Sequence, residues 1–139
     1  MASNDEGKPD AVKGTRPSRV VEQVAGCDPS VRGVVVLDEL GQILAGWSAM
    51  PATTTDQLST AMVSKMGIVA KIVMGAVGKE TGVWGGLDFM VAAFQNDKLL
   101  LIDMHDQNRT LVLGIPRSTM ADSVYDKVAK ILAATKSQS

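Results

Sequence analysis

Residues 56–77, DQLSTAMVSKMGIVAKIVMGAV, are the longest stretch of helical pattern in the chain, and they decide how the rest of the fold must pack. Three threonines at 53–55 offer N-cap side chains, and Asp56 places a negative charge in the first turn, where the helix dipole favours it. Gly78 follows as a residue type that commonly ends helices. The sequence therefore predicts one long helix over residues 56–77.

Polar and small side chains are gathered on one side of this helix. At about 100° per residue they form a stripe that is roughly 80° wide. The stripe consists of Gln57, Thr60, Ser64, Gly67, Lys71, Gly75 and Gly78. Apart from Ser59, Lys65 and the terminal residues, the remaining side chains are apolar.

The apolar side of the helix is wider than one sheet requires. A helix that lies on a sheet and faces water needs an apolar arc of little more than about 100°, and this helix has about twice that. Because a monomer rarely leaves a large apolar patch exposed, we expect a second copy of the helix to cover the surplus in a two-fold dimer. Coverage by a tail or a terminal helix of the same chain is the alternative.

Strand patterns flank the long helix on both sides. Before it, the β-branched run 31–37 and the run 42–47 are joined by the acidic, glycine-containing turn 38–41, which predicts an antiparallel hairpin. Strands are also predicted over residues 87–95, 98–105 and 110–115, and helices over residues 18–27 and 119–133. This order indicates the α/β class, of the α+β type. The simplest packing is a five-stranded antiparallel sheet with the long helix on one face and the terminal helices on the other.

Composition divides the chain into one domain and two polar ends. Residues 1–17 hold almost no apolar side chain and are predicted to be a disordered tail. Residues 18–133 form the predicted domain, and residues 134–139 are predicted to be a polar C-terminal tail.

Charge and hydropathy exclude several classes of protein. The 139 residues include 14 basic and 15 acidic side chains, so the basic excess that a nucleic-acid partner requires is absent. No apolar run reaches the roughly 18 residues of a membrane span, and the first residues lack the apolar core of a signal peptide. Cys27 is the single cysteine, which excludes an internal disulfide and suits a reducing compartment. We therefore expect a cytoplasmic protein.

The Gly78-Lys79 pair is similar to the end of a phosphate-binding loop, but the match fails in detail. Val73 stands where the first glycine of that motif is required, and Glu80 stands at the Ser/Thr position. These residues also end a helix, whereas the motif begins one. The pattern does not indicate nucleotide binding.

The other chemically capable residues do not form a recognisable site. His105, the single histidine, lies near Asp103 and Asp106, and two or three such ligands at a strand end are common by accident. Cys27 is expected to be a small buried hydrophobe. The sequence therefore predicts no catalytic residue, no cofactor and no metal site, and the protein is not expected to be an enzyme.

The element order and three local patterns resemble the Roadblock family, named for the dynein light chains of that type. Residues 31–45, VRGVVVLDELGQILA, are similar to the opening hairpin of the family. Residues 58–77 are similar to its central helix, and residues 87–115 to its next three strands. The resemblance covers about residues 18–133.

This resemblance implies a sheet order and a mode of dimerisation. The family's sheet order is 2-1-5-4-3, and its members pair the third strands edge to edge and the central helices side by side. The implied interface contains Met62, Met66, Val69, Val73, Leu87, Phe89 and Val91. The partner would be a second copy of the chain or a paralogue.

The resemblance also implies a function without catalytic residues. Family members act as dynein-associated light chains, as scaffolds for Rag-type GTPases or as activators of bacterial polarity GTPases. We therefore expect a dimeric scaffold or regulator that binds a small Ras-like GTPase. A structural adaptor that joins subunits of a larger complex without nucleotide dependence is the alternative. A domain that senses a small molecule is a third possibility, although the predicted core shows no converging polar groups.

Overall fold

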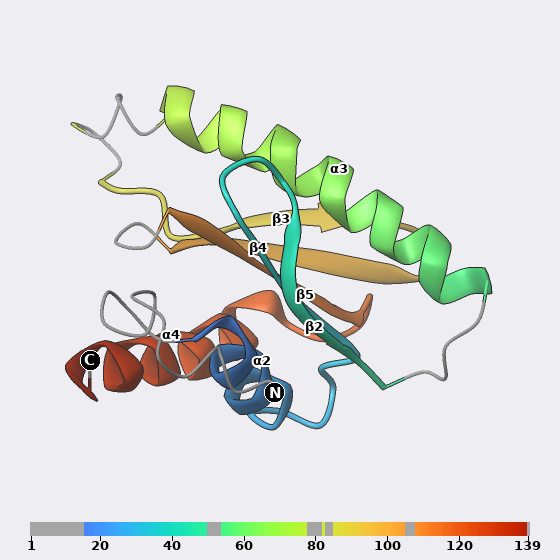
Figure 1. Cartoon of the computed structure of the whole chain (residues 1–139), viewed down its shortest axis with the longest axis horizontal. Coiled ribbons are helices and arrows are strands. Elements are labelled where there is room, and N and C mark those ends of the chain that lie inside the picture. Colours follow the sequence, from blue (N-terminus) through green and yellow to red (C-terminus); the bar gives the residue numbers. More distant parts are fainter. Residues whose placement is uncertain (1–15, 50–53, 78–81, 83–84, 105–107, 139) are drawn as a thin grey trace, which may run out of the picture.

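The computed structural model describes residues 16–49, 54–77, 82, 85–104 and 108–138, with side chains throughout these ranges except 54–64 and 135–138. Its elements are α2 (Pro17–Ala25), β1 (Gly33–Leu37), β2 (Ile43–Ser48), α3 (Thr54–Val77), β3 (Met90–Ala93), β4 (Asp97–Met104), β5 (Arg109–Pro116) and α4 (Ala121–Gln138). Figure 1 shows α3 on one side of the sheet and α2 and α4 on the other. The predicted order of elements and the two-sided packing are confirmed.

Several element ends differ from the prediction. α2 begins at Pro17, because proline suits a first helical position where its missing N–H is not needed. α4 continues to Gln138, past the predicted end near residue 133, since residues 133–138 contain no glycine or proline to stop it. β3 is shorter than the predicted strand 87–95. Of the predicted N-terminal tail, residues 1–15 lie outside the described part of the chain.

Asp38 organises the turn between β1 and β2. Its carboxylate accepts hydrogen bonds from the backbone N–H groups of Leu40 at 2.8 Å and Gln42 at 2.9 Å. Gly41 has a φ of +85°, which glycine adopts without the steric cost of a Cβ. The predicted acidic, glycine-containing hairpin turn is therefore confirmed.

The five strands form one antiparallel sheet in the order β2-β1-β5-β4-β3. This is the order that the Roadblock resemblance implied. β5, which comes last along the chain, lies in the middle between β1 and β4. β2 and β3 are consequently the two edges of the sheet.

Strand side chains alternate between the two faces of the sheet. In β4, Leu100 and Ile102 belong to the core beneath α2 and α4, whereas Leu101 belongs to the core beneath α3. The α2/α4 core consists of Val20, Val21, Val24, Val31, Val34, Val36, Leu100, Ile102, Met104, Leu111, Leu113, Ile115, Val124 and Val128. The α3 core has fewer buried members among the described side chains: Leu37, Ala70, Met74, Leu101 and Val112. Both faces are therefore covered, but to different extents.

Candidate interaction surface

The rotation of α3 about its own axis determines which of its side chains meet the sheet. Gly67 and Ala70 are buried, and Met74 lies beside them in the α3 core. A Cβ added at Gly67 would collide with Cδ1 of Leu37 on β1. Glycine at this position therefore allows α3 to approach the sheet closely.

The polar stripe of α3 turns partly toward the sheet. Lys71 extends its amine to Asp103 on β4, with Nζ and Oδ1 3.5 Å apart. The two side chains are only 28% and 16% exposed. Of the stripe residues whose burial the structure describes, Gly67 and Lys71 face the sheet, whereas Gly75 is exposed.

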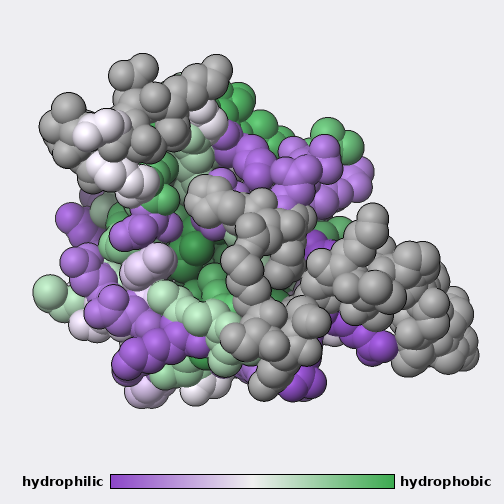
Figure 2. Space-filling model, turned by 90° about the vertical axis from the view of Figure 1, so that its left-hand side faces the viewer, coloured by the Kyte–Doolittle hydropathy of each residue, from purple (hydrophilic) through white to green (hydrophobic). Residues whose placement is uncertain are grey.

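The outward side of α3 is apolar over its described second half. Ile72 is 68% exposed and Val69 50% exposed, and Ile68 is also exposed. Lys65 is the charged residue on this side within the described side chains. Figure 2 shows apolar atoms reaching the surface at the top of the molecule, the level at which α3 lies in Figure 1. We call Ile68, Val69 and Ile72 the outer face of α3.

The edge strand β3 is a second region with exposed apolar side chains. Its sequence, MVAA, contains no charge or proline, and its pairing with β4 runs without a bulge. Val91 and Phe94 are exposed beside this edge. β2, at the other edge, has a bulge opposite Val36 and Leu37, a device that commonly discourages further strand pairing. Within the described residues, no bulge, charge or proline interrupts β3 itself.

The structure places the residues of the predicted interface in different environments. Val69 and Val91 are exposed, and Val73 is half-buried. Met66 and Leu87 pack against the α3 core. The other two are placed differently: Phe89 packs against the α2/α4 core on the opposite face of the sheet, and the side chain of Met62 lies outside the described residues. Their membership of an interface stays a prediction.

Sequence reasoning did not single out four of the exposed apolar residues. These are Ile68, Ile72 and Val77 on α3 and Phe94 after β3. Ile68 and Ile72 lie on the side of the helix that faces away from buried Ala70, so the helix wheel would have identified them once its inward side was known. Val77 is the last residue of α3. The sequence alone gave no sign that a lysine would face inward.

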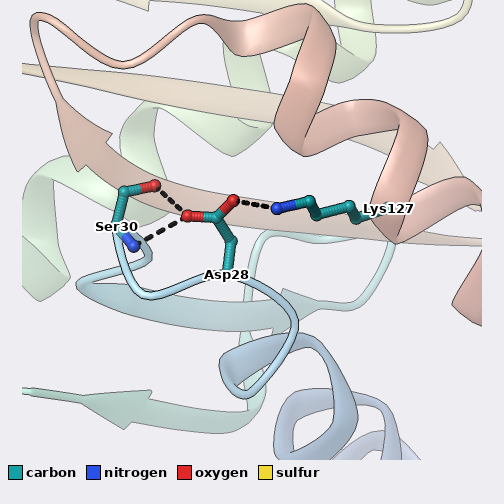
Figure 3. A network of polar contacts seen from close by, with 3 residues as sticks. All are labelled: Asp28, Ser30 and Lys127. Carbon is teal, nitrogen blue, oxygen red and sulfur yellow. Dashed lines mark hydrogen bonds and ion pairs between the residues drawn. The ribbon is translucent and has the colours of Figure 1, made fainter.

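Asp28 joins the loop between α2 and β1 to α4. Its carboxylate accepts hydrogen bonds from the backbone N–H and the hydroxyl of Ser30, at 2.8 and 2.7 Å, and pairs with Lys127 Nζ (Figure 3). The hydrogen bond from Lys127, followed by those from Ser30, holds the pKa of Asp28 well below its usual range. The same contact raises the pKa of Lys127. The network ties together two segments of the layer opposite α3.

Two other groups near this layer have altered acidity. Burial raises the pKa of the Cys27 thiol, and the neighbouring Asp28 carboxylate raises it further. Cys27 was predicted to be a small buried hydrophobe; it packs against the α2/α4 core but is only half-buried. Burial also raises the pKa of Tyr125, whose ring centroid lies 4.6 Å from that of Phe89. A raised pKa favours the neutral thiol over the thiolate, which is the nucleophilic form.

The polar patterns considered in the sequence mostly lie beyond the described residues. Gly78, Lys79, His105 and Asp106 are outside them. Within the ranges that the structure describes, no three histidine, cysteine or acidic side chains gather as metal ligands would. In the same ranges, no helix has both the length and the apolar character that crossing a membrane requires.

Comparison with known proteins places the fold. No family model and no curated protein matches the sequence. The structure is similar to the Roadblock/LC7 domain from Streptomyces avermitilis, with a TM-score of 0.61 and 13% identity over 87% of this chain and 95% of that one. It is similar to MglC from Myxococcus xanthus, with a TM-score of 0.60 and 10% identity over 87% and 97%.

A third solved structure gives the same result. The gliding protein MglB from Thermus thermophilus matches with a TM-score of 0.56 and 14% identity, over 87% of this chain and 88% of that one. The likeness extends over most of each chain although few residues are identical. The protein therefore has a Roadblock-type fold, as the sequence resemblance implied.

Proposed function

Starting from this Roadblock-type fold, we propose that the protein is a non-enzymatic scaffold or regulator that dimerises through α3 and β3 and binds a small Ras-like GTPase. The observation that carries the proposal is the outer face of α3, where Ile68, Val69 and Ile72 are exposed in a single chain. Isolated apolar residues on a surface are ordinary, but several on one helix face indicate a protein contact.

A second copy of the chain is the partner that best fits this surface. A two-fold axis places the same patch on both partners, so an apolar helix face in one copy meets an apolar helix face in the other. The position of β3 at the edge of the sheet supports the same arrangement, because among the described strands it pairs only with β4 and its other side is suited to another strand. A paralogue with a similar helix face would use the same chemistry.

The GTPase part of the proposal is supported by the resemblance to a family of scaffolds and regulators. Pull-downs with the full chain against small GTPases loaded with GDP or with a non-hydrolysable GTP analogue test it. Nucleotide-dependent capture, or faster GTP hydrolysis in the presence of the protein, is the expected result. Equal capture in both nucleotide states would favour the structural adaptor, and no capture in either state would contradict GTPase binding.

Two variants make this experiment specific for the proposed surface. Val69→Asp places a charge on the outer face of α3, and Met120→Asp places the same charge on an exposed apolar residue just before α4. The first should reduce both self-association and GTPase capture, because burying an unpaired charge is costly. The second should change neither. Equal loss with both variants would contradict the assignment of function to α3.

A further inference from the structure

The turn between β1 and β2 is shaped by its first residue and its glycine. Asp38 accepts hydrogen bonds from the backbone N–H groups of Leu40 and Gln42, and Gly41 has a positive φ. These contacts use only the backbone of Leu40, whose side chain is 71% exposed. Figure 1 shows this turn as the teal loop that projects from the sheet. Because turns favour glycine, proline and small polar residues, the fold does not account for a leucine at this position.

The bulge in β2 adds two more apolar side chains to the same hairpin. Leu44 is the extra residue, because it has no partner on β1 where the register of the two strands shifts. Bulges change the direction of the side chains around them, and both Ile43 and Leu44 are exposed. We call Leu40, Ile43 and Leu44 the hairpin patch. It places three branched apolar side chains at the surface within five consecutive residues.

The hairpin patch is separate from the surface assigned to the dimer. β2 lies at the edge of the sheet opposite β3, so pairing of β3 edges would leave β2 uncovered. One exposed apolar residue on a surface is ordinary, whereas several together indicate a protein contact. Hydrogen bonds within the chain already hold the turn, so little free energy would be lost in ordering its backbone on binding. The bulge discourages an added strand, which leaves contact through side chains.

Acidic side chains border the hairpin patch. Within the described residues, Asp38 accepts hydrogen bonds from backbone N–H groups, and Glu39 accepts one from the side-chain amide of Asn108 at 3.1 Å. These donors are neutral, so neither carboxylate forms an ion pair in this part of the chain. Arg109, the neighbour of Asn108, supplies one positive charge against these two negative ones, which leaves a net charge of −1. The patch is therefore an apolar centre with an acidic border.

The charge of this border determines which partner fits. A second copy meeting the patch across a two-fold axis would bring two acidic borders together, and like charges repel. Membrane surfaces carry negative charge and favour apolar segments with an excess of lysine or arginine, whereas this border is acidic. A protein surface with an apolar centre and a border of lysine or arginine matches both the apolar side chains and the charge.

We propose that the hairpin patch is a second docking surface, which binds a partner protein through an apolar segment bordered by lysine or arginine. Leu40 is the central contact, because it is the most exposed of the three, and Glu39 attracts the basic side chains. This surface goes beyond the proposed function, since neither α3 nor β3 takes part in it. A dimer would carry two such surfaces, one on each chain.

Peptide selection identifies the chemistry of the partner before its identity is known. A phage-displayed library of random peptides is selected against the full chain, and the dissociation constants of enriched peptides are measured by fluorescence anisotropy. The enriched peptides should combine apolar residues with lysine or arginine. Leu40→Ser should weaken their binding about tenfold or more, as the loss of a central contact does. Enrichment of acidic peptides, or of no peptide, would overturn the proposal.

Matched variants locate the binding on the hairpin. Met120→Ser removes an apolar side chain that is 68% exposed just before α4, and it should leave the affinity unchanged. Leu44→Ser should weaken binding as Leu40→Ser does, and circular dichroism checks that each variant is folded. If Leu40→Ser and Leu44→Ser bind as tightly as the unmodified protein, the patch is not the docking surface. Peptides that are lost only with Ile72→Asp would have the same meaning, because they bind α3.

Removal of one charge tests the acidic border. Glu39→Gln keeps an oxygen acceptor for Asn108 but loses the negative charge. It should weaken binding of the basic peptides about threefold, and the difference should disappear at high salt, where exposed charges are screened. Equal affinity of the two proteins at low salt would contradict a basic partner.

Two further measurements separate a partner protein from the other occupants. Sedimentation equilibrium should give the same mass for Leu40→Ser as for the unmodified protein, and vesicles of phosphatidylcholine and phosphatidylglycerol should float without the protein. A smaller mass for Leu40→Ser, or lipid binding that needs Leu40, would overturn the proposal. A protein that stays a monomer yet selects basic peptides through Leu40 would lose the proposed dimer and keep this surface. A dimer whose peptides ignore Leu40 would have the opposite meaning.

Discussion

The layer formed by α2 and α4 and the layer formed by α3 cover the same sheet in contrasting ways. On the α2/α4 side, Val24 and Val128 are fully buried, and charged residues such as Glu22 and Lys130 face water. On the α3 side, a glycine and a lysine turn toward the sheet, and Ile72 is left exposed. The α2/α4 layer thus has its apolar side inward, whereas α3 has a large part of its apolar side outward.

The residues that stabilise the fold of a single chain can therefore be distinguished from the residues that are available to a partner. Side chains that are buried within one chain contribute to its stability whether or not a partner is present. Side chains that are exposed on α3 contribute only when something covers them, so their effect should depend on protein concentration. Substitutions on the two sides should therefore affect different measurements.

The largest effect is expected from the middle of the α2/α4 core. Leu113 lies on the central strand β5 and is fully buried. Leu113→Ala should lower the free energy of unfolding by about 3 to 4 kcal/mol, because the substitution leaves a cavity. Urea unfolding followed by circular dichroism measures this loss. A loss below about 1 kcal/mol would mean that this core is not the main source of stability.

The second largest effect is expected on the affinity of the dimer and not on the stability of the folded monomer. Ile72→Asp is expected to weaken the dimer at least about a hundredfold, equivalent to about 2.7 kcal/mol, while the dilute monomer remains folded. Sedimentation velocity over a concentration series measures the change. Met120→Asp is the matched control, since Met120 is also 68% exposed but lies just before α4. Equal weakening by both substitutions would remove the contrast between the two layers.

Two glycines of α3 distinguish its inner side from its outer side. At Gly75 an added Cβ would meet nothing within 4 Å, so Gly75→Ala should stabilise the helix by about 0.5 to 1 kcal/mol. At Gly67 the added Cβ would collide with buried Leu37, so Gly67→Ala should destabilise the protein by about 1 kcal/mol. Thermal unfolding of the two variants tests the difference in sign. Stabilisation by both would mean that α3 does not approach the sheet closely.

The smallest effect concerns the acid dependence of the α2/α4 layer. The pKa of Asp28 is lowered in the folded state by Lys127 and Ser30, so its carboxylate favours folding above the ordinary pKa of 3.8. This contribution is lost as the pH falls from there toward the lowered pKa of the folded state. Asp28→Asn should therefore lower the urea midpoint at pH 7, and the difference should shrink at pH 3. A difference that does not shrink would exclude the carboxylate as the cause.

The sequence predicts most of the fold because its local patterns are strong. The β-branched run at 31–37, the acidic turn at Asp38 and the long helix each have a local physical signal, and the structure confirms them. The order of strands was available only through the resemblance, because antiparallel strands of similar composition can pair in several ways. Element ends were less accurate, as α4 shows by continuing to Gln138.

The candidate surface was harder to predict than the fold. The width of the apolar arc on α3 indicated more apolar surface than the sheet can cover. Which side of α3 meets the sheet was seen only in contacts such as those between Lys71 and Asp103, 32 residues apart, and between Gly67 and Leu37. Such long-range contacts leave no periodic signal in the sequence. Phe89 shows the same limit, since its partner Tyr125 belongs to α4 and draws it to the other face of the sheet.

The mass of the protein in solution tests most directly whether a second copy covers the outer face of α3. The chain has a mass of 14.6 kDa, so sedimentation equilibrium at micromolar concentration should give twice that value. Ile72→Asp should return the mass to that of one chain. A mass of one chain for the unmodified protein throughout the micromolar range would contradict the account.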